Sequence, residues 1–177
     1  VRKLHTSQVD AFSSGKYGIL GSIEDNSVIW HKRPQSTIKL GTPTVLANIH
    51  ICKAYTGMSD TSLKFIEETD TDGLVIEAFG KGNIPPNVVP YIKQTVSKGV
   101  PVVITSRCLF GNTTPTYGYP GGGADLERVG AWFAQDLSTE KVRLLMSVAL
   151  GLGLSKETLR EIIRQRGICS DFELFLS

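Results

Sequence analysis

Apolar runs alternate with amphipathic segments along the chain from residue 44 onward. The runs 45–54, 73–78 and 100–105 are rich in β-branched residues, and each ends in glycine or polar residues that suit a turn. Between them, 59–69 and 86–98 carry apolar residues at the three-to-four spacing of a helix. Alternating strands and helices form right-handed crossovers, so the pattern predicts an α/β fold: a parallel sheet with helices on both faces.

The predicted helices have expected starting residues and apolar faces. Ser59 or Asp60 is expected to cap the first helix. The residues expected to face the sheet are Leu63 and Ile66, with Phe65 as a further candidate, in the first helix, and Val88, Val89, Ile92 and Val96 in the second. Further helices are predicted over 125–134, 138–150 and 155–166, and the aromatic segment 171–177 is expected to pack.

The first 41 residues have a different pattern. Short β-like runs at 27–30 and 37–40 are separated by Gly, Asn, Ser and Pro, which is typical of hairpins. The segment 24–27, Glu-Asp-Asn-Ser, is the expected turn, because Asp and Asn tolerate the left-handed conformation. We therefore predict a strand and connector segment over 1–41 and one α/β domain over 42–177.

The segment 72–86 contains the strongest local signal. An apolar run ends in Gly80-Lys-Gly82-Asn83, and two prolines follow, which predicts a strand, a tight turn and a helix start. Asn83 is expected to cap that helix. The third glycine of a dinucleotide-binding fingerprint is missing, so a turn is favoured over a phosphate site. Glu77 interrupts the apolar run and is expected to be paired or to lie near the rim of the sheet.

Composition narrows the classes of protein. The chain of 177 residues is 41% hydrophobic and 20% charged, which is enough apolar content to bury a core. Its net charge is +2 and its basic residues are scattered, which argues against a nucleic-acid partner. No apolar stretch reaches the roughly 20 residues of a membrane span, and residues 1–5 lack the apolar core of a signal peptide, so no membrane contact is expected.

The cysteines and histidines give no sign of a metal site. The residues are Cys52, Cys108 and Cys169, and His5, His31 and His50. The cysteines are odd in number and lack ligand spacing, and the histidines are widely separated, so neither a disulfide framework nor a bound metal is predicted. The chain begins with valine, which we interpret as a fragment or a processed product.

Several segments together resemble the C-terminal domain of the L-asparaginase family, which is flavodoxin-like. They are Asp-Gly-Leu-Val-Ile-Glu-Ala-Phe-Gly-Lys-Gly-Asn-Ile-Pro at 72–85, Thr-Ser-Arg-Cys at 105–108, the glycine-rich 117–123, and Asp-Leu-Ser-Thr-Glu-Lys-Val-Arg at 136–143. Residues 5–14 and 17–21 resemble the end of the family's first domain. The resemblance covers about 2–151.

The resemblance implies an amidohydrolase that converts L-asparagine and water to L-aspartate and ammonia without a cofactor. Its nucleophile would be a threonine near the amino terminus, assisted by a second threonine, an aspartate and a lysine. The chain contains no Thr-Gly-Gly-Thr, and Thr69-Asp-Thr-Asp72 is interpreted as a polar turn. We therefore expect the catalytic residues upstream, an inactive isolated chain, a cytoplasmic location and a homo-oligomer, either a dimer or a tetramer.

The same resemblance implies a supporting role in substrate binding. In the family, the first domain of one subunit meets the second domain of a neighbour at the active site. The loop 53–59 offers Gly57 where some members have asparagine, and the loop 111–123 offers Tyr117 and Tyr119 but no acid. Either tyrosine hydroxyl could contact substrate, or both rings could pack at a subunit contact.

Other interpretations stay open. Cys108 could line an effector pocket or fill the core, and Arg107 could pair with a carboxylate within the chain or across an interface. The chain could also belong to an asparaginase-like subunit of a tRNA-dependent amidotransferase. A non-catalytic ligand-binding or assembly module, with a ligand at the carboxyl ends of the strands, is the alternative from another class.

Overall fold

The chain divides into two compact units, Val1–Thr37 and Ile38–Ser177. The computed structural model describes residues 1–33 and 38–165, except the side chain of Glu67. The predicted packing of 171–177 lies outside the described residues, as does Arg166 at the end of the last predicted helix. Among the described residues no helix has both the length and the apolar character needed to span a membrane.

The smaller unit contains two antiparallel strand pairs. β1 (Arg2–Lys3) pairs with β2 (Phe12–Ser13), the short helix η1 (Gly15–Tyr17) follows, and β3 (Gly21–Glu24) pairs with β4 (Ser27–Trp30). Asp25 and Asn26 have φ values of 45° and 62°, the two left-handed residues of a tight hairpin. This confirms the predicted turn. The run 37–40 is not a strand over 38–40, and Thr37 lies outside the described residues.

The larger unit is built on a parallel sheet of four strands in the order β5-β6-β7-β8. These strands are β5 (Ile49–Lys53), β6 (Gly73–Ala78), β7 (Val102–Ser106) and β8 (Trp132–Phe133). Val75 lies in register with Ile51 on one side and with Val103 on the other. The three predicted strands are therefore parallel neighbours, as expected, but the one predicted over 45–54 begins only at Ile49.

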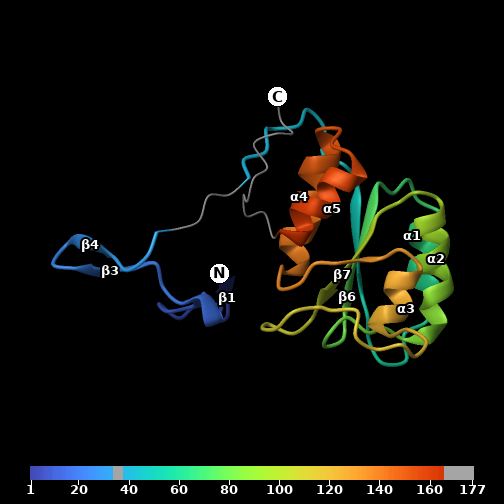
Figure 1. Cartoon of the computed structure of the whole chain (residues 1–177), viewed down its shortest axis with the longest axis horizontal. Coiled ribbons are helices and arrows are strands. Elements are labelled where there is room, and N and C mark those ends of the chain that lie inside the picture. Colours follow the sequence, from blue (N-terminus) through green and yellow to red (C-terminus); the bar gives the residue numbers. More distant parts are fainter. Residues whose placement is uncertain (34–37, 166–177) are drawn as a thin grey trace. The chain divides into compact units, whose positions relative to one another are not determined.

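Helices cover both faces of this sheet (Figure 1). On one face lie α1 (Thr61–Glu67) and α2 (Val89–Ser97), with η2 (Pro86–Val88) and α3 (Gly123–Arg128) nearby. On the other face lie α4 (Thr139–Gly151) and α5 (Lys156–Arg164). Leu63, Ile66 and Ile92 are buried as predicted, whereas Phe65 is exposed. The α/β fold class is confirmed.

Two further local predictions were wrong. The helix expected over 125–134 ends at Arg128, because Gly130 takes φ 99° and the aromatic pair Trp132–Phe133 then joins the sheet as β8. Asn83 does not cap a helix. Its backbone exchanges two hydrogen bonds with Phe79 across the Gly80–Gly82 turn, and the next helix begins only at Pro86.

Each face of the sheet has its own apolar core. Even-numbered strand residues such as Leu74, Ile76 and Ile104 pack against α1, α2 and α3. Odd-numbered residues such as Val75 and Val103 pack against α4 and α5. The alternation follows the period of two of a strand, and burial on both faces explains why the run 73–78 is almost continuously apolar.

Candidate functional site

Three loops form the carboxyl edge of the sheet, where parallel strands end together. They follow β5, β6 and β7, and they are joined by hydrogen bonds between loops. The Asn87 amide donates to the Met58 carbonyl at 2.9 Å, the Ile84 N–H to the Gly121 carbonyl at 2.9 Å, and the Thr114 N–H to the Lys81 carbonyl at 2.9 Å. The predicted loops 55–59 and 111–123 therefore share this edge, which is where ligands collect in open α/β sheets.

Tyr117 and Tyr119 lie next to each other in the longest of these loops. Their rings stack with centroids 5.7 Å apart and an angle of 27° between planes, and they are 43% and 52% exposed. The backbone beneath them is fixed, because their carbonyls accept hydrogen bonds from Ala124 and Gly122. Neither hydroxyl has a hydrogen-bond partner among the described residues, so both can meet an added group.

Gly57 lies at the tip of the loop after β5. It has φ 76°, and a Cβ added there would meet no atom within 4 Å. The left-handed backbone therefore favours glycine at this position, and crowding plays no part. An asparagine, which tolerates this conformation, would find room for its side chain at the same edge of the sheet.

A polar row crosses the sheet just before this edge. Lys53, Glu77 and Thr105 are in register on adjacent strands. Lys53 Nζ lies 2.8 Å from Glu77 Oε1, and the Thr139 hydroxyl, in the first turn of α4, donates to Glu77 Oε2 at 3.1 Å. Thr105 and Thr139 are buried and their hydroxyls lie 2.9 Å apart. Glu77 is paired, as expected, and it joins the sheet to the start of α4.

The remaining predicted candidates have other surroundings. The Arg107 guanidinium lies 4.7 Å from the Phe79 ring centroid and forms no ion pair among the described residues. Cys108 is exposed, so it is not core filler, whereas burial raises the pKa of the Cys52 thiol; Cys169 lies outside the described residues. The described part of the chain contains no group of three metal-binding side chains.

The segment Thr69–Asp72 is a polar turn, as interpreted from the sequence. The Thr69 hydroxyl donates to the Ile66 carbonyl at 2.8 Å. Asp72 Oδ2 accepts from the Asn48 N–H at 2.7 Å, and the Asp72 N–H donates to the Asn48 carbonyl at 3.0 Å. These bonds fix the connection that enters β6.

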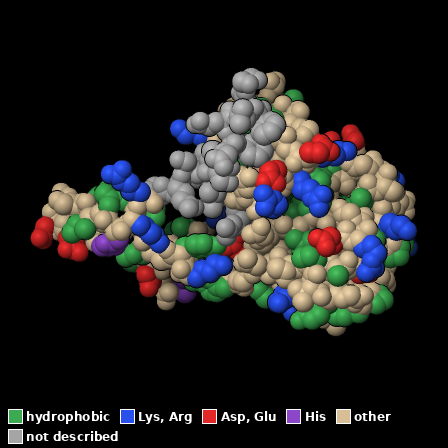
Figure 2. Space-filling view, in the orientation of Figure 1, with side chains coloured by type: hydrophobic (Ala, Val, Ile, Leu, Met, Phe, Trp, Pro, Cys, Tyr) green, Lys and Arg blue, Asp and Glu red, His purple; other side chains and the backbone are tan. Residues whose placement is uncertain are grey.

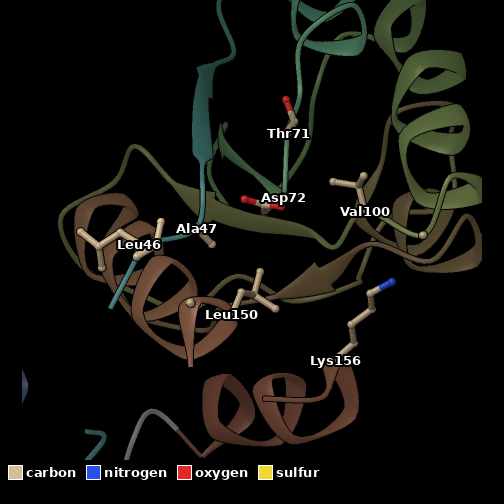
Figure 3. A pocket seen from close by; sticks show the side chains of 10 residues that line it. Leu46, Ala47, Thr71, Asp72, Val100, Leu150 and Lys156 are labelled. Atoms are coloured by element: carbon tan, nitrogen blue, oxygen red, sulfur yellow. The ribbon is translucent and has the colours of Figure 1, made fainter. Parts of the chain in front are cut away.

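A cavity of about 510 Å³ lies at the opposite, amino edge of the sheet, and no motif or spacing in the sequence indicates it. Its lining residues come from the connections into β5, β6 and β7, from the end of α4 and from the start of α5: Val45, Leu46, Ala47, Thr71, Asp72, Gly99, Val100, Leu150, Gly151 and Lys156. Figure 3 shows the labelled side chains around an open space, with Asp72 on the strand side and Lys156 on α5.

Charge on the larger unit is mixed. On the face shown in Figure 2, Lys and Arg side chains are interspersed with Asp and Glu side chains. Proteins that follow a nucleic-acid backbone need basic side chains gathered along a stripe. The described residues on this face form no such stripe.

Comparison with known proteins identifies the larger unit. Residues 48–163 match the model of the Glutaminase/Asparaginase C-terminal domain. A probable L-asparaginase from Deinococcus radiodurans is 39% identical over 169 residues, and a subunit of the glutamyl-tRNA(Gln) amidotransferase from Methanosphaera stadtmanae is 34% identical over 119 residues. The first alignment covers 93% of this chain and 51% of its relative; the second covers 63% and 27%.

A solved structure agrees with these relatives. A probable cytoplasmic L-asparaginase from Campylobacter jejuni superposes with a TM-score of 0.76 at 28% identity, covering 92% of this chain and 52% of that one. The chain thus spans about half the length of these asparaginases. From the matched domain and the 39% identity, we conclude that the chain belongs to the glutaminase/asparaginase family.

Proposed function

We propose that this chain supplies the C-terminal domain of an L-asparaginase-like amidohydrolase, which converts L-asparagine and water to L-aspartate and ammonia. The observation that carries the proposal is the match of residues 48–163 to the family's C-terminal domain, together with an asparaginase relative that aligns over 93% of the chain. Residues 42–177 form this domain, and 1–41 end the domain that precedes it.

The domain's contribution is a binding edge rather than a nucleophile. Activating a threonine hydroxyl requires an adjacent base and a site for the oxyanion. The sequence has no Thr-Gly-Gly-Thr, and the Thr69 and Thr71 hydroxyls and Asp72 Oδ2 form hydrogen bonds within the turn and its connections. The nucleophile therefore belongs to the other half of the enzyme, and the loops at the carboxyl edge close over substrate held there.

Tyr117, Tyr119 and Gly57 are the residues of this edge that meet the substrate. The two hydroxyls without partners among the described residues and the open space at Gly57 support this assignment. The substrate's α-amino and α-carboxylate groups need hydrogen-bond partners, and a tyrosine hydroxyl can either donate or accept. The loops complete the active site of a neighbouring copy in a homo-oligomer, which is a dimer or a tetramer. The enzyme is cytoplasmic, and the reaction uses no cofactor.

The test is ammonia release from L-asparagine by the enzyme that contains this domain. Release is expected from that enzyme and not from the 177-residue chain alone. L-Glutamine, assayed in parallel, gives the preference between the two amides. Turnover by the isolated chain that is abolished by replacing one of its own threonines would contradict the assignment, because it would put the nucleophile in this chain.

A second function is supported by relatives that are amidotransferase subunits. The Methanosphaera stadtmanae relative, at 34% identity, is part of a glutamyl-tRNA(Gln) amidotransferase. A subunit of this kind would release ammonia for a partner that modifies aminoacyl-tRNA. Amide hydrolysis that depends on an added partner protein and charged tRNA would favour this function, whereas hydrolysis independent of both favours the asparaginase. Ligand binding with no hydrolysis under either condition would favour a non-catalytic module.

A further inference from the structure

The cavity at the amino edge of the sheet is open to solvent and has the volume of a small-molecule site. Its volume of about 510 Å³ lies within the range of about 300–1,000 Å³ that is usual for such pockets. Val45, Leu46, Val100 and Leu150 provide an apolar wall, and Val45 and Leu46 are 73% and 52% exposed. A bound apolar group would cover surface that is otherwise in contact with water.

Lys156 places a positive charge at this cavity, although it lies at the amino end of a helix. It is the first residue of α5, after the N-cap Ser155, and the amino end of a helix disfavours a cation. It forms no ion pair with any described residue, and its Nζ would lie 3.1 Å from a Cβ added at Gly99. An unpaired cation in such a position is well placed to receive a carboxylate.

Asp72 brings the opposite charge from the strand side. Its Oδ2 and its backbone N–H are both hydrogen-bonded to Asn48, at 2.7 Å and 3.0 Å, so the side chain is held in place. Its other carboxylate oxygen accepts no hydrogen bond from the described residues. The fixed carboxylate therefore presents an open acceptor to an ammonium group.

We propose that this cavity binds a small zwitterion with an apolar side chain, an α-amino acid of the leucine type. The ammonium group pairs with Asp72, the carboxylate with Lys156, and the side chain covers the apolar wall (Figure 3). A simple anion or a simple cation would leave one of the two protein charges unmatched. The proposal concerns binding alone and does not depend on the amidohydrolase function.

The experiment is calorimetric titration of the 177-residue chain with three probes. L-Leucine carries both charged groups, 4-methylpentanoate lacks the ammonium, and 3-methylbutylamine lacks the carboxylate. We expect L-leucine to bind and each truncated probe to bind about tenfold more weakly or worse, since a charge-assisted contact is lost. Absence of L-leucine binding, or equal affinity for the three probes, overturns the proposal.

Variants with matched controls test whether each of the two charges contributes to L-leucine binding. Lys156→Met and Asp72→Asn should each weaken L-leucine binding about tenfold, while Lys93→Met and Asp70→Asn, which change exposed residues outside the cavity, should leave it unchanged. Circular dichroism of each variant establishes that it is folded. Lys156→Met should fold normally, because it removes a charge that the helix end disfavours. Unchanged affinity in folded Lys156→Met overturns the proposal.

Discussion

At the scale of single residues, Glu77 has two partners that contribute very differently to stability. The ion pair with Lys53 is largely in solvent, because the Lys53 side chain is 68% exposed, and such pairs contribute about 0–1 kcal/mol. The hydrogen bond from Thr139 lies in a buried group of hydroxyls. An unsatisfied buried donor costs about 1–3 kcal/mol, so the acceptor role of Glu77 outweighs its charge.

Substitutions at Glu77 should separate these two roles. Glu77→Gln keeps an acceptor for Thr139 and should lower the free energy of unfolding by less than about 1 kcal/mol. Glu77→Ala removes the acceptor and should lower it by about 1–3 kcal/mol. Urea unfolding followed by circular dichroism measures both. Equal losses in the two variants would mean that the charge, and not the acceptor, stabilises this part of the sheet.

The tyrosine pair should affect substrate binding more than stability. In the enzyme that contains this domain, Tyr117→Phe or Tyr119→Phe should raise KM for L-asparagine roughly threefold to tenfold, which corresponds to one lost hydrogen bond. The melting temperature should change little, because both rings are about half exposed. Unchanged KM in both variants and in the double alanine variant would leave packing at a subunit contact as the role of this pair.

At the scale of elements, the sequence predicted what depends on local periodicity and missed what depends on distant contacts. The strand 73–78 and the turn at Asp25 and Asn26 could be predicted from the residue types in those segments, and the structure agrees. The two residues of β8 are too few to show a period, and only pairing with β7 makes them a strand. Asp72 and Lys156 meet the same cavity only because the fold brings α5 to the start of β6.

The two glycines of the turn after β6 offer a matched pair of substitutions. Gly80→Ala and Gly82→Ala both place a side chain at positive φ. The φ of 45° at Gly80 lies near the left-handed region, where the cost is about 1–2 kcal/mol, whereas the φ of 114° at Gly82 lies outside that region and costs more. At Gly80 the new methyl group meets nothing within 4 Å, whereas at Gly82 it would lie 2.8 Å from Phe133 Cε1. Gly82→Ala should therefore lose roughly 1–3 kcal/mol more in urea unfolding. Equal losses would show that Phe133 can move aside.

A polar contact links α1 and α2 and should respond to pH. The Tyr91 hydroxyl donates to Asp60 Oδ2 at 2.6 Å, and Lys64 Nζ lies 2.9 Å from the same oxygen. The Tyr91 hydrogen bond, with smaller help from Lys64, lowers the pKa of Asp60 below its ordinary value. A lowered carboxyl pKa stabilises the fold above the unfolded pKa, and this stabilisation is lost as pH falls through the folded pKa.

The matching variant is Tyr91→Phe, which removes the hydroxyl and keeps the ring. It should be less stable than the parent at neutral pH, and the difference in the urea midpoint should shrink as pH falls through the folded pKa of Asp60 and the carboxylate is protonated. Asp60→Asn provides the control, because it removes the titrating group. A stability difference that stays constant from neutral to acidic pH would mean that the Tyr91 hydroxyl acts independently of the charge on Asp60.

At the scale of the whole molecule, the two units differ in how much apolar surface they bury. The larger unit has a sheet with an apolar core on each face. The hairpin of β3 and β4 instead exposes Ile23, Val28 and Trp30, and an isolated pair of strands is marginal in water. The fold class and the family could be predicted because they rest on long periodic segments and several motifs. The exposure of the apolar hairpin residues could not be predicted, because the sequence pattern does not show which surfaces pack against them.

The central claim is that this chain contributes binding loops, and not the nucleophile, to an asparaginase-type enzyme. The most direct measurement is ammonia release from L-asparagine, with the enzyme that contains this domain and the isolated 177-residue chain assayed side by side. The account predicts turnover by the enzyme, a raised KM in its Tyr117→Phe or Tyr119→Phe variant, and no release by the isolated chain. Release by the isolated chain, or an enzyme that leaves L-asparagine intact, would contradict it.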